Sequence, residues 1–265
     1  MNDLDRPGPD PGESVPSSPG DADAIELQVN LTALAGIVAG SKALPEILAQ
    51  VATFAARAIP GADGAGVTLL RLDRDDNIVE ALAASAPFVA EIDEIQYSVL
   101  NEGPCITAAR ERHTVRSGSL GGEKQWPRFG PRVGRLGVHS VLSLPLLLPD
   151  QVVGAINVYA HGKDVFDDRC QELGELFAAP AAVAVHNAQI LAQAQALAGQ
   201  LQTALASRPI IDQAVGILRA RTGASAEEAF GRLRAISQTE NTKLLVVAQR
   251  LVDEAVRRAR ARTET

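Results

Sequence analysis

Two apolar runs, at residues 138–148 and 151–160, follow one another with only Pro149 and Asp150 between them. Val, Ile and Leu dominate both runs, and proline with aspartate is typical of a tight turn, so the pattern predicts a β-hairpin. A second pair of strand-like runs, at residues 66–72 and 77–85, flanks four polar residues and predicts another hairpin. Strands that follow one another as hairpins form an antiparallel sheet, which excludes a purely helical fold.

Apolar residues at helical spacing surround these strands. They occur at residues 25–38, at 47–55 behind a proline, at 103–112, and from 168 onward. Helices between and outside hairpins predict an α+β domain, in which an antiparallel sheet is flanked by helices. We place this domain at residues 25–187.

The last of these helices is predicted to continue beyond the domain. Its apolar residues recur at alternating steps of four and three, which is the spacing of a coiled-coil seam. We therefore predict a linker helix at residues 188–207 that pairs with the same helix of a second copy. The alternative is a helix that packs only on its own domain. The seam residues are Ile190, Ala194, Leu197, Leu201 and Ala204.

Residues 208–265 have the pattern of three short helices. Pro209 predicts a break before the first helix, and Gly223 predicts its end. Ser225 and Glu228 have the spacing of a capping box, which begins the second helix, and a third follows. Because each helix has one apolar face, the segment is predicted to form a three-helix bundle with a small core.

Charge divides the chain in a similar way. The 265 residues have a formal net charge of −7, to which residues 1–24 contribute −5, residues 25–207 contribute −6 and residues 208–265 contribute +4. The first segment consists largely of Pro, Gly, Ser and Asp, which predicts a disordered acidic tail. The basic end indicates that the bundle meets a different partner from the acidic domain before it.

Simple counts exclude several classes of protein. No stretch of about 18 apolar residues occurs, so no membrane span is expected, and the acidic, proline-rich start is unlike a secretory signal. Cys105 and Cys170 are too few for a disulfide scaffold or a cysteine-rich zinc site. These features predict a cytoplasmic protein with no membrane partner.

Signs of catalysis are sparse in this sequence. The four histidines have no metal-ligand spacing, and the glycine-rich loops that cradle phosphates are absent. We therefore expect no catalytic residue, no metal site and no cofactor. Cys105 needs separate attention, because a thiolate behind Pro104 at a helix start is stabilised by backbone amides. A redox role is the alternative to a small buried apolar side chain.

The α+β domain contains the residue types of a small-molecule pocket. Aromatic residues are only 3% of the chain, and several of them lie in this domain near Ser and Asn side chains of the apolar strands. An apolar cavity with a few polar groups is the usual form of a ligand site. The predicted pocket residues are Tyr97, Cys105, Trp126, Ser140, Asn157 and Tyr159.

The C-terminal segment contains the strings QAVGIL at 213–218, AFGRLRAIS at 229–237, KL at 243–244 and VA at 247–248. Over about 50 residues this pattern resembles the ANTAR domain, an RNA-binding antiterminator module. One departure is Val215, which stands where that family usually has lysine. The resemblance, together with the basic charge, implies an RNA-binding surface. Its predicted residues are Gln213, Arg219, Arg221, Arg234, Asn241 and Lys243.

The strings GPC at 103–105, QWPRF at 125–129, GVHSVLSLPL at 137–146 and VVGAINVYA at 152–160 resemble a GAF domain, a small-ligand sensory fold. Together the two resemblances imply a GAF–ANTAR antitermination regulator of the actinobacterial type. In such a protein a signal at a GAF dimer, such as an unknown small-molecule ligand, controls the presentation of paired bundles to small RNA hairpins in a nascent transcript.

Two other functions remain open at this point. Three small basic helices also occur in helix-turn-helix units, so a DNA-binding regulator is one alternative. The other is a GAF-type methionine sulfoxide reductase that uses Cys105.

Overall fold

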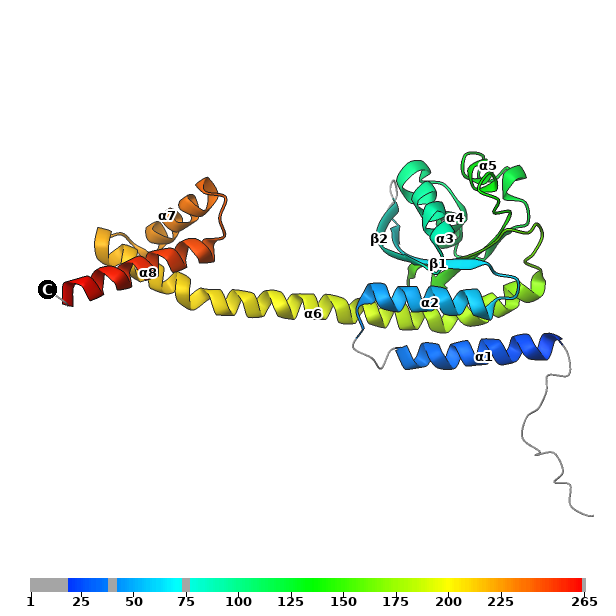
Figure 1. The fold of residues 1–265 in the computed structure, drawn as a ribbon, viewed down its shortest axis with the longest axis horizontal. Coiled ribbons are helices and arrows are strands. Elements are labelled where there is room, and N and C mark those ends of the chain that lie inside the picture. The colour runs from blue at the N-terminus through cyan, green and yellow to red at the C-terminus, as the bar shows by residue number, and fades with distance from the viewer. Residues whose placement is uncertain (1–18, 38–41, 73–76, 264–265) are drawn as a thin grey trace, which may run out of the picture. The chain divides into compact units, whose positions relative to one another are not determined.

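The computed structural model describes residues 19–37, 42–72 and 77–263 (Figure 1). The chain divides into two compact units, residues 1–192 and 193–265. Helix α6 (Asp168–Thr222) begins in the first unit and ends in the second. None of the helices in the described ranges combines the length and the apolar character that crossing a membrane requires.

The first unit has the mixed α+β composition that the sequence predicts. Its elements, in chain order, are α1 (Pro19–Ile37), α2 (Leu44–Ala58), β1 (Gly64–Leu72), β2 (Asn77–Ala84), α3 (Pro87–Asp93), the π-helix η1 (Glu94–Leu100), α4 (Pro104–Glu111), β3 (Val115–Ser117), the 3₁₀ turn η2 (Leu120–Gly122), α5 (Phe129–Gly134), β4 (Ser140–Leu147), β5 (Val152–Ala160) and the first part of α6.

The five strands form one antiparallel sheet in the order β2-β1-β5-β4-β3. Both predicted hairpins are confirmed, since β1 pairs with β2 and β4 pairs with β5. The turn predicted at residues 73–76 lies outside the described residues. Strand β5 is the last to occur in the sequence, yet it lies at the centre of the sheet between β1 and β4.

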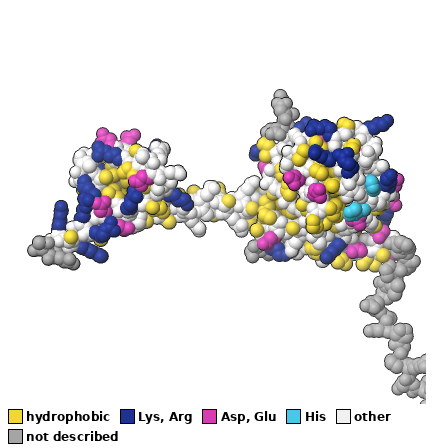
Figure 2. Space-filling model, turned by 45° about the horizontal axis from the view of Figure 1, so that its top comes forward, with side chains coloured by type: hydrophobic (Ala, Val, Ile, Leu, Met, Phe, Trp, Pro, Cys, Tyr) yellow, Lys and Arg dark blue, Asp and Glu magenta, His cyan; other side chains and the backbone are white. Residues whose placement is uncertain are grey.

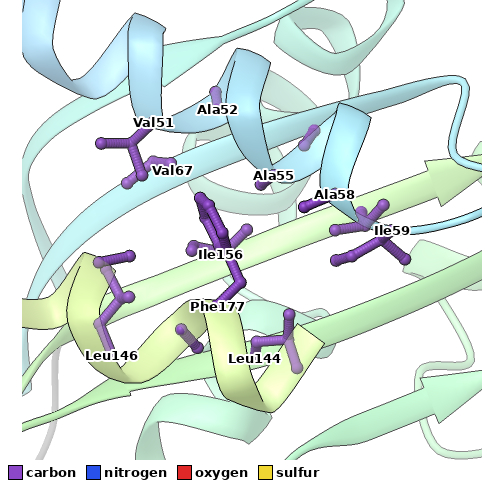
Figure 3. Close-up of a cluster of buried hydrophobic side chains, with 14 of the residues drawn as sticks. Val51, Ala52, Ala55, Ala58, Ile59, Val67, Leu144, Leu146, Ile156 and Phe177 are labelled. Carbon is purple, nitrogen blue, oxygen red and sulfur yellow. The ribbon is translucent and has the colours of Figure 1, made fainter. Parts of the chain in front are cut away.

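Alternation along the strands gives the sheet two different faces. On one face, Leu144 of β4 and Ile156 of β5 pack with α2 and the first part of α6. Phe177 of α6 is fully buried at the centre of this cluster, and Figure 3 shows its ring pointing between the helices and the sheet. We call this the α6 face; it contains the larger hydrophobic core.

The predicted disordered tail, residues 1–24, needs a correction at its end, because α1 already begins at Pro19. Proline is favoured in the first turn of a helix, and alanines such as Ala22 and Ala24 are strong helix formers. Residues 1–18 lie outside the described residues.

The predicted helix break at Pro209 is wrong. Helix α6 continues through both Pro180 and Pro209 to Thr222. A proline inside a helix removes one N–H donor and costs about 3 kcal/mol. Ile210 and Ile211, directly after Pro209, pack against the core of the second unit, and this burial offsets the cost.

The second unit consists of the end of α6, helix α7 (Ala226–Thr239) and helix α8 (Leu244–Thr263). Its core is small and contains Ala214, Leu233, Val247 and Ala248. The predicted capping box at the start of α7 is confirmed. The Glu228 N–H donates to Ser225 Oγ at 3.2 Å, and the Ser225 N–H donates to Glu228 Oε2 at 2.8 Å.

Candidate functional site

The second face of the sheet is more polar than the α6 face. The strand register pairs Gly66 of β1 and Ser143 of β4 with Asn157 of β5, and it pairs Gly64 with Tyr159. Residues two apart on a strand share a face, so Asn157 and Tyr159 point the same way. Helices α3 and α4 lie over this face in Figure 1, and we call it the α4 face.

Polar side chains from the covering helices meet those of the strands. Tyr97 Oη donates a hydrogen bond to Thr68 Oγ1 at 3.0 Å. The backbone N–H of Cys105 donates to Gln96 Oε1 at 3.2 Å, and Ser143 Oγ donates to Asn157 Oδ1 at 2.6 Å. We define the polar cluster as the side chains of Gln96 and Tyr97 together with four others that lie beside them. Its members are Asp93, Gln96, Tyr97, Cys105, Asn157 and Tyr159.

Several atoms of the polar cluster have no hydrogen-bond partner among the described residues. They are both carboxyl oxygens of Asp93, Nε2 of Gln96, Nδ2 of Asn157 and Oη of Tyr159. All four side chains are buried, and Asp93 is only 1% exposed. A buried polar group without a partner costs about 1–3 kcal/mol, so native proteins rarely gather several in one place. This concentration marks the polar cluster as a candidate ligand site.

Asp93 is the central acidic group of the polar cluster. Burial raises its pKa to about 7. Its carboxyl group lies close to strand β1, because a Cβ atom at Gly66 would lie 3.1 Å from Asp93 Oδ2. Asp93 ends α3 and is followed by the π-helix η1, a rare form of helix that often occurs at functional sites.

The environment of Cys105 is unfavourable for a nucleophile. The thiol is fully buried, and this burial raises its pKa to about 12. A reactive cysteine needs a lowered pKa and access to solvent. The second cysteine, Cys170, belongs to the α6-face core and so is not at hand as a resolving thiol. These observations support the interpretation of Cys105 as a buried side chain.

The structure brings together four of the six predicted pocket residues, namely Tyr97, Cys105, Asn157 and Tyr159. Trp126 packs in the core near Tyr159, but its Nε1 donates to Thr107 Oγ1 at 2.9 Å. Ser140 does not join the cluster. Its Oγ donates to the Gly162 carbonyl at 2.8 Å and accepts from the Val165 N–H at 3.2 Å, so it holds the loop after β5.

Asp93 and Gln96 are functional candidates that the sequence interpretation missed. They lie in the segment 87–100, between the two predicted hairpins, to which no element was assigned. A signal was present there, because Val89, Ile92, Asp93 and Gln96 follow one another at steps of three, one and three residues, which places them on one face of a helix. Polar residues on an otherwise apolar helix face indicate either a buried hydrogen-bond network or a site.

Helix α6 carries a row of exposed apolar side chains. Leu176, Val183, Ile190 and Leu197 recur at intervals of seven residues, and each is between 49% and 60% exposed. The predicted coiled-coil seam is therefore uncovered in a single chain, and it extends back to Leu176. Exposed apolar rows of this length are typical of surfaces that contact another protein.

The second unit carries the candidate nucleic-acid interface. All six predicted RNA-binding residues are exposed. Within the described residues, no ion pair occupies Arg219, Arg221, Arg234 or Lys243, whereas Arg250 pairs with Glu240 at 2.6 Å. Figure 2 shows Lys and Arg side chains around a hydrophobic area on the visible face of this unit.

The predicted RNA-binding residues do not all lie on one helix face. Arg219 and Arg221, in the last turn of α6, are two positions apart and so about 200° apart around the helix. Arg221 points about 80° away from Gln213 around the helix axis, whereas Arg219 points about 120° away from it, so Arg221 is the closer of the two to the Gln213 side. Arg234 is on α7, and Asn241 and Lys243 lie in the turn before α8. Asn241 has a left-handed backbone with a φ of 48°.

Comparison with known structures finds GAF domains. The matches include the GAF domain of a phosphoenolpyruvate-protein phosphotransferase from Acinetobacter (14% identity, TM-score 0.46, 63% of this chain and 97% of that one) and the corresponding domain from Coxiella burnetii (17%, 0.46, 66% and 98%). A free methionine-R-sulfoxide reductase from Neisseria meningitidis, solved with its substrate, also matches (16%, 0.47, 66% and 96%). TM-scores below 0.5 carry no weight for function. A comparison with curated protein sequences finds no match.

Family models give the assignment directly. The GAF domain model matches residues 41–186, which is more than half of the chain, and the ANTAR domain model matches residues 199–252. The first match covers the sheet with both of its faces, and the second covers the exposed basic surface of the second unit. The chain therefore belongs to the GAF-domain family and carries an ANTAR domain after its GAF domain.

Proposed function

We propose that this protein is a cytoplasmic, signal-responsive antitermination regulator that binds small RNA hairpins through its ANTAR domain under the control of its GAF domain. The observation that carries this proposal is the ANTAR match over residues 199–252. Four exposed cations of that segment support it, because Arg219, Arg221, Arg234 and Lys243 have no ion pair within the described residues and are available to neutralise phosphates.

The input is proposed to be a small polar molecule at the polar cluster. The ligand is expected to carry groups that complement the unpartnered atoms of the cluster. An N–H group or a cationic nitrogen of the ligand would donate to the Asp93 carboxyl group. A carbonyl or carboxylate oxygen accepts from the Gln96 and Asn157 amides and the Tyr159 hydroxyl. Because α3 and η1 supply two of these side chains, Asp93 and Gln96, ligand binding would order or shift the helices that cover the α4 face.

Two copies are proposed to pair along α6. In a heptad frame with Val183, Ile190 and Leu197 at one core position, Asn187 and Ala194 occupy the other. An asparagine at one core position of a coiled coil fixes the register and favours two strands. Pairing would present two ANTAR domains together, which matches a target made of two hairpins.

Pairing is tested by placing like charges in the seam. Ile190→Glu with Leu197→Glu is expected to convert a dimer into a monomer, since two glutamates per chain would face their copies. Sedimentation equilibrium of the full chain measures the change. The control is Gln195→Glu with Gln202→Glu, which adds the same charge to exposed positions on the opposite side of α6 and should leave the dimer intact. A wild-type monomer, or a dimer that survives the seam variant, contradicts this interface.

RNA binding is tested with Arg234→Ala combined with Lys243→Ala. The double variant is expected to bind a paired-hairpin RNA more weakly and to reduce the slope of log affinity against log salt concentration by about 1–2. Filter binding over a salt series measures both quantities. The control is Arg250→Ala, because Arg250 is already paired with Glu240.

Duplex DNA of matched length distinguishes the alternative regulator. Equal binding of wild type to RNA and DNA would contradict the proposed RNA specificity. An unchanged affinity and salt slope in the double variant would show that Arg234 and Lys243 lie outside the contact surface.

A further inference from the structure

Phe230 is the only aromatic residue in the sequence of the second unit, residues 193–265. It lies on α7 and is 39% exposed, while the adjacent residue Ala229 is fully buried. The core of this unit is built from Ala, Leu, Val and Ile side chains, and Phe230 is not one of them. An aromatic ring that lies outside this core and leaves 39% of its surface exposed needs another explanation.

The neighbours of Phe230 on α7 define the chemistry of this surface. Arg234 follows Phe230 by four residues, so the two side chains are adjacent on one helix face. Gln238 continues that face by another turn, and Asn241 lies two residues beyond the end of α7. The buried residues Ala229 and Leu233 lie about 60–100° to one side of Phe230. Glu227, one turn before, is the acidic neighbour.

We infer that Phe230 is a stacking platform for an unpaired nucleobase in the loop of an RNA hairpin, and that Arg234 binds the phosphate beside that base. This inference rests on the proposed function, because it names a contact within the proposed RNA interface. A nucleotide offers a flat π-face together with a negative charge, and Phe230 with Arg234 offers the complementary pair. Hairpin loops present the unstacked bases that aromatic side chains bind.

A protein partner fits this surface less well. The second unit carries a net charge of +4 from residues 208–265, and Arg234 has no ion pair within the described residues. An apolar protein surface would leave this cation without a partner at the contact, whereas a phosphate satisfies it.

The test compares four forms of the full chain, namely wild type, Phe230→Ala, Phe230→Leu and Phe230→Trp. The probe is a hairpin RNA with 2-aminopurine in its loop, and affinity and fluorescence are measured over a salt series. We expect Phe230→Ala to weaken binding by about 5- to 100-fold, which corresponds to the loss of one base–aromatic stack. The salt slope should stay unchanged, since no phosphate contact is lost. Phe230→Trp should retain the affinity and quench the 2-aminopurine further.

Phe230→Leu separates stacking from packing, because leucine keeps an apolar side chain at this position but has no ring. It should bind about as weakly as Phe230→Ala while its thermal unfolding stays close to that of wild type. Full affinity in Phe230→Leu or Phe230→Ala would overturn the inference and leave RNA binding itself intact. Absence of hairpin binding by wild type would overturn the proposed function, and the inference with it.

Discussion

Replacing Asp93 with asparagine is expected to raise the free energy of unfolding of the first unit at pH 8 by up to about 4 kcal/mol. The carboxyl group has a pKa of about 7 in the folded protein and about 3.9 in an unfolded chain. Between these values the folded state holds a proton that the unfolded state has released. The stability of wild type therefore falls as the pH rises from about 4 to 7 and is constant in this respect above pH 7.

Asparagine carries no charge at any of these pH values, so Asp93→Asn removes this pH dependence. Urea unfolding at pH 4.5, 6 and 8 measures it, with a gain of only about 1 kcal/mol expected at pH 4.5 and the largest gain at pH 8. Glu94→Gln is the control, because Glu94 is the adjacent carboxyl group but is exposed. If the free energy of unfolding of both variants followed the same pH dependence as wild type, ionising Asp93 would carry no cost. That result would contradict the description of Asp93 as a buried acid without a partner. A gain in stability on removing Asp93 would indicate that it is present for binding rather than for folding.

Phe177→Ala is expected to lower the free energy of unfolding of the first unit by about 3–5 kcal/mol, since it removes a fully buried ring from a packed core. For a unit of this size the loss corresponds to a fall in the melting temperature of about 6–20 °C. The ring lies between α2, α6 and the sheet (Figure 3), so no single element can move to fill the space.

Calorimetry of the full chain measures this effect. Glu172→Ala, one turn earlier on an exposed part of α6, should change the stability by no more than about 0.5 kcal/mol. An equally small effect of Phe177→Ala would contradict the description of this residue as the anchor of α6. Because α6 is the covalent route from the GAF domain to the ANTAR domain, a loosened anchor should also reduce any effect of the GAF input on RNA binding.

The hairpins were predictable from the sequence because their signals are local. Residues 138–160 contain two apolar strands and their turn within one short segment, and the Ser225–Glu228 capping box is a pattern of four residues. The order of the strands was not predictable in this way. The pairing of Gly66 with Asn157 joins positions 91 residues apart, and no local pattern specifies it. Pro209 gave a misleading local signal, since packing of the next residues outweighed the usual preference.

The polar cluster shows a similar division. Tyr97, Asn157 and Tyr159 stood out as rare or polar residues in apolar surroundings, and the structure places them together. Ser140 stood out in the same way, but it lies at the start of β4 and bonds to the loop after β5. Asp93 and Gln96 depend on the path of the chain through α3 and η1. A π-helix changes the register of side chains in a way that no simple periodicity in the sequence reveals.

The central position of β5 also affects the order of events during synthesis. Strand β1 is complete at Leu72, but its partner β5 begins only at Val152. At about 5–20 residues per second, the 79 residues between them take about 4–16 s to emerge from the ribosome. During that time one edge of β1 has no partner, and the α6-face core lacks the helix that closes it. The nascent chain therefore passes through a long period in which an apolar strand edge is open to wrong pairing or to chaperones, and this period ends when β5 has been made.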